Sequence, residues 1–249
     1  RNKRNGVQKI YSKSNEAFHR IDMAKIRPEL QDDDLRKLQS SAEAAFYRAC
    51  RDQLPDGMLV VHSAAWTYRT SDGTPSEGEA DFTIFDPKGG FVTVEVKGGG
   101  IEYDGTLGKW SSTDRYGNKR EIKDPFRQAT REKHCVLDQL KGSQEWRQTM
   151  GSDRILAGHA VFFPDIDDIK KLVGPNAPVE LVGGRKNLKD VASWLATVAS
   201  FWVGKTNFTP IQDRGVRIAE RIFCSSISVS ALLAADIERE EQIRIEVTM

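Results

Sequence analysis

The sequence predicts an α/β protein in which one central mixed β-sheet is flanked by helices. Three observations lead to this fold class. A helical pattern over residues 32–54 precedes a group of strands, a second helical pattern over 125–142 follows them, and a short apolar strand lies at 155–164. The order helix, strands, helix and strand is typical of a layered fold with a single sheet. We expect a C-terminal helical appendage over residues 165–249.

The first helix is predicted by apolar residues that recur at helical spacing. Acids stand at its start, and the turn residues from Leu54 to Gly57 end it. A largely apolar strand over residues 58–66 comes next, followed by a polar loop over 69–79. The stripe consists of Leu35, Leu38, Ala42, Ala45, Phe46 and Ala49.

The stretch "GEADFTIFDPKGGFVTVEVKGGG", residues 78–100, is expected to form a β-hairpin. Pro87 suits the second position of a type I turn, and the Gly that follows Lys88 can adopt positive φ, so residues 87–89 form the loop. In this register paired residue numbers sum to 176. The expected pairs are Phe85 with Phe91, Thr83 with Thr93, Asp81 with Glu95, and Glu79 with Lys97, all on one face.

The register places two carboxylates, Asp81 and Glu95, directly opposite each other. Their Cβ atoms would lie about 4.5–5.5 Å apart, where like charges repel, so the pair needs a cation. The hairpin therefore indicates a metal site with Lys97 beside it. The alternatives are a solvated strand face, a bound monovalent ion, or an ordinary Glu79–Lys97 ion pair. A bulge at Gly89 or Gly90 would flip the charges to the other face.

The second helix begins with a clear signal. Asp124 is a natural N-cap, Pro125 suits the first helical position, and Gly142 lies just beyond the end. Gln128 falls in the first turn, where unpaired N–H groups favour an anion. Arg127 and Arg131 lie one turn apart and either contact a phosphate backbone or are ordinary exposed charges. Turn-rich, short strands are expected between residues 98 and 123.

Two segments, "GEADFTIFDPKGGFVTVEVKGG" and the later "IKDPFRQA", resemble the nuclease-related domain (NERD) family. Asp81, thirteen intervening residues and then Glu95-Val96-Lys97 are similar to the PD-(D/E)xK nuclease motif, although Ala80 replaces its proline. The resemblance runs from about Leu38 to Pro164. It implies a restriction-endonuclease-like core over residues 31–164.

The resemblance also implies metal-dependent hydrolysis of phosphodiester bonds. Asp81 and Glu95 would hold Mg²⁺, or Mn²⁺ as its substitute, with Glu43 and the Val96 carbonyl as further ligands. Lys97 would act on the attacking water or the phosphate charge. Gln128 would position the substrate, with Arg127 and Arg131 on its backbone. Glu79 would orient Lys97 or be only a surface partner, and Glu43 has a solvated helix position as its alternative.

The partner expected from this resemblance is nucleic acid, with DNA favoured over RNA, in DNA processing or defence. Some NERD proteins join the nuclease-like module to a helicase, so a helicase domain or subunit is a further expected partner. Two alternatives stay open: a catalytically inactive nucleic-acid-binding module, and a protein-interaction domain. The sequence leaves the oligomeric state open, with a homodimer among the options.

Composition is that of an ordinary soluble globular protein, with 249 residues, 39% hydrophobic and 29% charged residues and a net charge of +1. No apolar run approaches the roughly 20 residues that span a bilayer, so no membrane partner is expected.

Three distant cysteines indicate a reducing cytoplasm. Residues 1–30 form a basic extension, and Met23 is a candidate native start. The four histidines, at positions 19, 62, 134 and 159, match no metal or triad pattern.

Overall fold

The computed structural model describes residues 23–69, 75–151, 154–173, 177–204 and 207–224. The strands are β1 (Lys25–Arg27), β2 (Leu59–Arg69), β3 (Pro75–Phe85), β4 (Phe91–Val96), β5 (Gly100–Asp104), β6 (Lys109–Thr113), β7 (Lys119–Ile122), β8 (Ala157–Phe163) and β9 (Val182–Gly184). The α-helices are α1 (Asp32–Lys37), α2 (Ser41–Gln53), α3 (Pro125–Gly142), α4 (Gln144–Met150), α5 (Val191–Val203) and α6 (Gln212–Phe223). Three short 3₁₀ helices lie at Ile169–Leu172, Val179–Leu181 and Arg185–Lys189.

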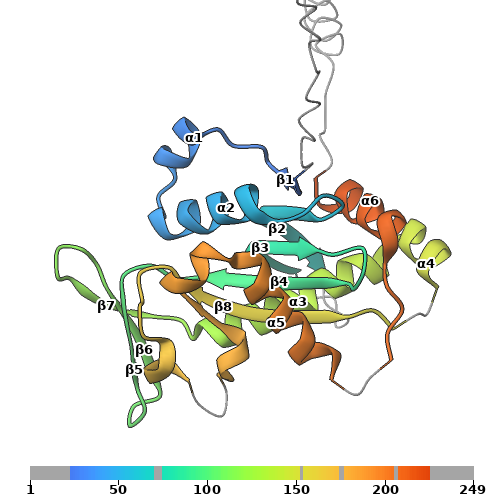
Figure 1. The fold of residues 1–249 in the computed structure, drawn as a ribbon. Coiled ribbons are helices and arrows are strands. Elements are labelled where there is room, and N and C mark those ends of the chain that lie inside the picture. Colours follow the sequence, from blue (N-terminus) through green and yellow to red (C-terminus); the bar gives the residue numbers. More distant parts are fainter. Residues whose placement is uncertain (1–22, 70–74, 152–153, 174–176, 205–206, 225–249) are drawn as a thin grey trace, which may run out of the picture.

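A six-stranded mixed sheet organises these elements, in the order β1-β2-β3-β4-β8-β9 (Figure 1). The three strands β2, β3 and β4 are antiparallel neighbours, whereas β1, β8 and β9 each run parallel to their neighbour. The mixed α/β architecture expected from the sequence is therefore confirmed.

The β3–β4 hairpin has the predicted register. Phe85 pairs with Phe91 and Thr83 with Thr93, and the ladder continues as far as Phe82 and Val94. The turn is closed by the Asp86 N–H, which donates to the Gly90 carbonyl at 2.9 Å. No bulge shifts these pairs, although neither Gly89 nor Gly90 adopts the positive φ that was expected of a glycine in this turn.

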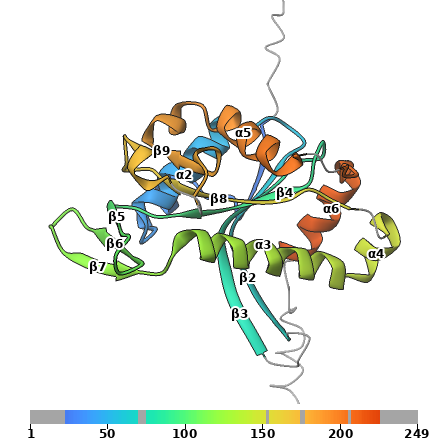
Figure 2. The ribbon, with the colours of Figure 1, turned by 90° about the horizontal axis from the view of Figure 1, so that it is seen from below.

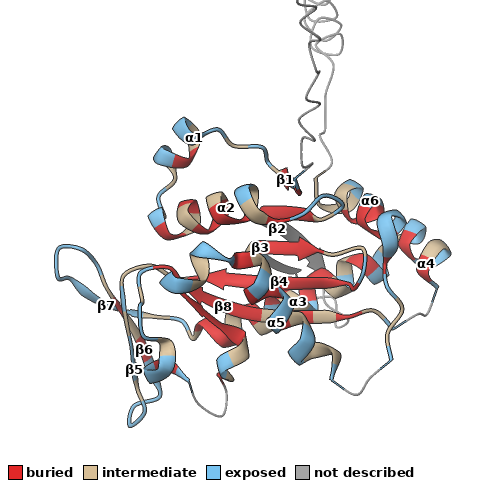
Figure 3. Cartoon of the chain, viewed as in Figure 1, coloured by how far each residue is buried: buried red, intermediate tan, exposed pale blue. Residues whose placement is uncertain are grey.

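Both faces of the central sheet are covered by helices, as Figure 2 shows. Phe82 and Val94 point to the face that α2 and α5 cover, where Phe46 of α2 packs against Phe82 at 4.8 Å between ring centroids. The other face lies under α3 and α6, and Thr93 donates its hydroxyl hydrogen to the Ala129 carbonyl of α3 at 3.1 Å. Strand β4 is buried at every position, as the red centre of Figure 3 shows.

A second, three-stranded antiparallel sheet extends from the body between β4 and α3. It is formed by β5, β6 and β7, where short strands were expected. Trp110 anchors it by packing against Phe126 at the start of α3, with 5.8 Å between ring centroids. This small sheet lies next to the end of β4 that carries Lys97, because β5 begins three residues later.

The first predicted helix is two helices. It breaks at Leu38–Ser40, where Ser40 caps α2 by accepting a hydrogen bond from the Glu43 N–H at 3.2 Å. A serine whose side chain can cap a helix favours a new helix start over a continuous helix. The spacing of the apolar residues does not reveal this break. The predicted loop over residues 69–79 is also largely strand, because β3 begins at Pro75 and pairs with β2.

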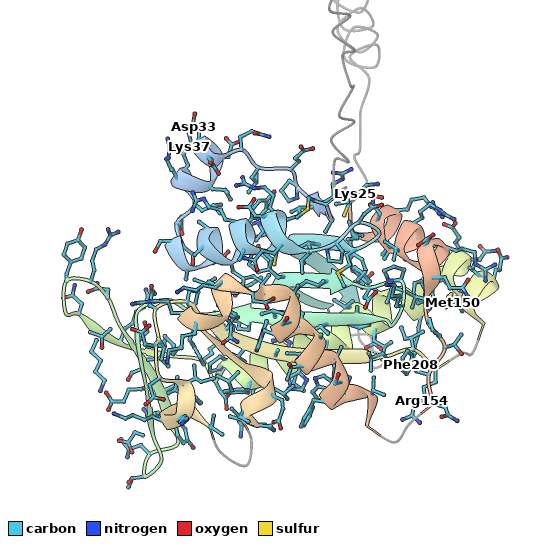
Figure 4. The ribbon with its side chains drawn as sticks, viewed as in Figure 1. Lys25, Asp33, Lys37, Met150, Arg154 and Phe208 are labelled. Carbon is cyan, nitrogen blue, oxygen red and sulfur yellow. The ribbon has the colours of Figure 1, made fainter. Side chains whose placement is uncertain are left out.

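The segment after Asp165 is part of the same body. It supplies β9 to the sheet edge, α5 to one core and α6 to the other, so up to Cys224 it is more than a helical appendage. At the other end of the chain, β1 belongs to the sheet although residues 1–30 were expected to be an extension. Lys25 of β1 forms an ion pair with Glu220 of α6 at 2.9 Å (Figure 4). Residues 1–22 and 225–249 lie outside the described residues.

No helix in the described part of the chain has the length and apolar character needed to cross a membrane.

Gly90 provides a test of how tightly the hairpin turn is packed. A Cβ at this position would lie 1.9 Å from the Leu156 carbonyl oxygen, which is backbone and cannot rotate away. We expect Gly90→Ala to lower the free energy of unfolding by about 2 kcal/mol or more, as overpacking does. Chemical denaturation measures this change.

Gly89 is the matched control, because a Cβ there would meet the Leu156 and Asp86 side chains at ordinary distances of 3.5 and 3.8 Å. Gly89→Ala should change stability by less than about 1 kcal/mol. Equal effects of the two substitutions would contradict the arrangement of β4 against the start of β8.

Candidate active site

The hairpin brings Asp81, Glu95 and Lys97 together where β3 and β4 separate. The β3–β4 ladder ends one pair before the position at which Asp81 would face Glu95. Strand β4 nevertheless continues beside β8, with Glu95 next to Val161, and β3 continues beside β2. The two carboxylates thus stand at a fork between strands that are held from both outer sides.

Asp81 uses its side chain to bridge this fork. Its Oδ2 accepts a hydrogen bond from the Val96 N–H at 2.8 Å. On β2, Ser63 lies between the His62–Phe82 and Ala64–Ala80 pairs and has a left-handed backbone with φ 54°. A non-glycine residue in that conformation carries strain, and such strain is concentrated at functional sites.

Lys97 is the cation that these carboxylates surround. Its ammonium contacts Glu95 Oε1 and lies 3.9 Å from Asp81 Oδ2. Burial by itself would lower the pKa of Lys97, but the charges of Glu95 and Asp81 outweigh burial and raise it. The lysine is therefore charged at neutral pH and stabilises negative charge, and it is not a proton acceptor there. Burial and the charge of Glu95 raise the pKa of Asp81, against the opposing effect of Lys97.

Glu79 does not face Lys97 as the extended register predicted. Its backbone pairs with Ala65 of β2, its side chain is exposed, and Lys97 contacts Glu95 instead. The pairing fails at this position because the strands have already separated at Asp81.

Glu132 of α3 is a site residue that the sequence analysis missed. It is only 5% exposed, and its carboxyl interacts electrostatically with that of Glu95. Burial raises the pKa of Glu132, and the charge of Glu95 raises it further. One signal was available in the sequence, because Glu132 lies three residues after buried Ala129 and four before buried Val136. A glutamate within the apolar stripe of a helix is unusual.

Glu43 approaches the site from α2, on the opposite face of the sheet. Its Oε2 lies 3.1 Å from Nε2 of His62, a β2 residue that is 3% exposed. Burial would raise the pKa of Glu43, but the hydrogen bonds from His62 and Ser40, together with the charges of His62 and Lys97, outweigh burial and the pKa is lowered. The charge of Glu43 acts on both Asp81 and Lys97. His62, which matched no motif, therefore has a polar partner at this site.

The start of α3 has the predicted cap. Asp124 accepts hydrogen bonds from the Phe126 and Arg127 N–H groups at 2.9 and 3.1 Å. Gln128, half-buried, lies one turn before Glu132 on the same helix, so it is close to the carboxylates. Arg127 and Arg131 are exposed, and Arg127 lies 3.6 Å from Asp124.

The site has carboxylate oxygens that could bind a cation, although they are not arranged as a set of metal ligands. Among the described residues, no group of three or more His, Cys, Asp or Glu is arranged to hold a metal ion. Both oxygens of Glu95 and Oε2 of Glu132 are nevertheless buried. None of these three oxygens accepts a well-directed hydrogen bond from a described residue. Unsatisfied carboxylate oxygens fit a hard cation such as Mg²⁺.

A cavity of about 420 Å³ lies elsewhere, at the turn end of the β3–β4 hairpin. Leu156, Leu195 and Phe208 are among the residues that line it, and the Asp86–Gly90 turn forms one wall. It is at the end of β4 opposite to Glu95, and its lining is mainly apolar. The carboxylate cluster, and not this cavity, brings together the ionisable side chains that the hairpin motif supplies.

Comparison with known families agrees with this geometry. The family described as nuclease-related domain (NERD) matches residues 38–164, just over half of the chain. The chain belongs to the NERD family. The matched segment of this NERD protein contains every site residue described above, from Glu43 on α2 to Glu132 on α3. No curated protein and no solved structure matched the chain.

The contact between Glu43 and His62 predicts a measurable coupling. A buried hydrogen bond with one charged partner contributes about 1.5–3 kcal/mol. We expect a double-mutant cycle of Glu43→Gln and His62→Leu, followed by chemical denaturation, to show a favourable coupling of at least about 1 kcal/mol.

The control cycle pairs Glu43→Gln with His159→Leu. His159 of β8 contacts Thr130 of α3 and the ring of Trp202 of α5. That pair should be additive to within about 0.5 kcal/mol. Additivity in both cycles would mean that the hydrogen bond between Glu43 and His62 does not form in solution.

Proposed function

We propose that this NERD protein is a metal-dependent nuclease that hydrolyses phosphodiester bonds, with DNA as its favoured substrate. The observation that supports this most directly is the convergence of Asp81, Glu95 and Lys97 at the fork between β3 and β4. One buried and one half-buried carboxylate beside a charged lysine provide both cation ligands and a cationic group for the phosphate.

The metal-binding residues in this proposal are Asp81, Glu95, Glu43 and the Val96 carbonyl. Mg²⁺ is the proposed ion, with Mn²⁺ as its substitute, because all four groups offer oxygen. When bound, such an ion polarises the scissile phosphate and lowers the pKa of a bound water.

The other residues act on the substrate. The Lys97 ammonium neutralises charge on the phosphate, and the hydrogen bond from the Val96 N–H holds Asp81 in place. Gln128, in the first turn of α3, orients the nucleic acid near the carboxylates. Arg127 and Arg131 on the exposed side of α3 contact the phosphate backbone. A cytoplasmic location fits three cysteines that lie far apart in the sequence, and a helicase is the proposed functional partner.

The decisive experiment measures cleavage of single- and double-stranded DNA and RNA by the purified protein with Mg²⁺, Mn²⁺ or EDTA. We expect cleavage only with a divalent ion, and Lys97→Ala should reduce its rate about 100-fold or more, as loss of one charge-stabilising group does. Lys88→Ala is the matched control. Lys88 is an exposed lysine at the turn end of the same hairpin, and its loss should leave the rate unchanged.

Two other results would count against this function. Cleavage in EDTA would contradict metal dependence. Tight nucleic-acid binding in EDTA, together with no cleavage under any condition, would favour the catalytically inactive binding module instead.

The role of the two α3 arginines can be tested by binding alone. We expect Arg127→Ala combined with Arg131→Ala to weaken DNA binding in EDTA uniformly across sequences. The slope of log affinity against log salt should fall by about 1 for each lost phosphate contact. Fluorescence anisotropy over a range of salt concentrations measures both. Lys141→Ala, in the last turn of the same helix, is the control, and an equal effect of Lys141 would refute a localised contact.

A further inference from the structure

Glu132 is not part of the hairpin motif, yet it is buried against it. Its side chain comes from the middle of α3, which covers the sheet face that carries Glu95. It is 5% exposed, and Glu95, whose charge acts on it, is 1% exposed. Taking a carboxylate out of water costs several kcal/mol unless a cation or hydrogen-bond donors compensate it. A purely structural helix position would be better served by an apolar residue.

The charges around Glu132 are not balanced. Asp81, Glu95 and Glu132 act electrostatically on one another, and Lys97 is the cation that acts on all three. Fully ionised, the cluster carries three negative charges against one positive charge. Glu43 on the opposite side of the sheet adds a further negative charge that also acts on Asp81. One ammonium leaves a deficit of positive charge, and a divalent ion has the charge to compensate it.

One oxygen of Glu132 also lacks a partner among the described residues. Oε2 of Glu132 is buried and accepts no hydrogen bond from any residue that the structure describes, as is true of both Glu95 oxygens. Buried acceptors without donors are rare in native proteins and usually have a functional reason. The unsatisfied oxygens and the charge deficit are two separate observations, and they point to the same ligand.

We propose that Glu132 is a further carboxylate of the cation site, in addition to Asp81, Glu95 and Glu43, and that it contributes directly to divalent-ion affinity. This inference rests on the proposed metal-dependent function and adds a residue of α3 to it. In the metal-free protein the ammonium of Lys97, which contacts Glu95, is the cation nearest to the carboxylates. The helix α3 thus contributes a ligand to the site as well as covering the sheet.

The test uses the full chain and Mn²⁺ as the probe, with affinity measured by isothermal titration calorimetry in the absence of nucleic acid. Glu132→Gln keeps the shape of the side chain and removes its charge. We expect Mn²⁺ to bind at least about tenfold more weakly to this variant, because a charged oxygen ligand is lost. Asp138→Asn is the control, an exposed acid on the same helix, and should change the affinity less than about twofold.

Thermal unfolding of the metal-free variant distinguishes a cation-site residue from a merely structural one. Removing a buried carboxylate that is repelled by two others should leave the melting temperature unchanged or raise it. Lower Mn²⁺ affinity without loss of stability supports the proposal. A lower melting temperature with unchanged affinity would identify Glu132 as a structural acid and overturn the proposal.

The outcomes also separate this inference from the proposed function. If Asp81→Asn abolishes Mn²⁺ binding and Glu132→Gln does not weaken it, the metal site exists without Glu132, and only this inference fails. If the unmodified protein binds neither Mn²⁺ nor Mg²⁺, the metal-dependent function fails and this inference fails with it.

Discussion

Burying a carboxylate costs several kcal/mol unless a cation or hydrogen-bond donors compensate it, and in this NERD domain Asp81, Glu95 and Glu132 share the ammonium of Lys97. The surrounding elements accommodate this cluster. The antiparallel ladder between β3 and β4 stops where two carboxylates would be forced into contact. Asp81 then uses a side-chain oxygen to bond the Val96 N–H, which would otherwise lack a partner on that side.

The sheet around the fork is rigid because each of its strands is held by a second neighbour. β3 stays paired with β2, and β4 stays paired with β8 as far as Val96 and Phe162. Beyond the last pair, the Lys97 N–H still donates to the Phe162 carbonyl at 3.0 Å. The Lys97 backbone is therefore fixed on the β8 side while its side chain reaches back to Glu95. Such positioning on strands is more precise than on loops, as charge-stabilising groups require.

Helices on both faces of the sheet then complete the site. α3 lies on the face that carries Glu95 and presents Gln128 and Glu132 one turn apart. α2 lies on the other face and presents Glu43, whose carboxylate contacts the imidazole of His62. The His62 ring itself packs between the rings of Tyr47 and Phe82. Tyr47 in turn donates its hydroxyl hydrogen to the Pro28 carbonyl, so the segment after β1 is connected to the site through packed side chains.

The sequence by itself determined the elements whose signals are local. The hairpin register followed from the Asp86–Gly90 turn and from side-chain alternation, because turn type sets which residues pair. The start of α3 followed from Asp124 and Pro125, since capping depends on adjacent residues. The motif residues Asp81, Glu95 and Lys97 could be recognised for the same reason, because they lie within one hairpin.

Only the tertiary structure decided what depends on contacts between distant segments. The approach of Glu132 to Glu95, the contact between Glu43 and His62, and the place of β9, α5 and α6 in the two cores all arise from helix-on-sheet packing. Periodicity shows which face of a helix is buried, but not what that face meets. The exposed position of Glu79 has a related cause. The β3–β4 ladder ends before Asp81 and Glu95, where two carboxylates would repel each other. A register extrapolated from the turn does not include that repulsion, so it wrongly paired Glu79 with Lys97.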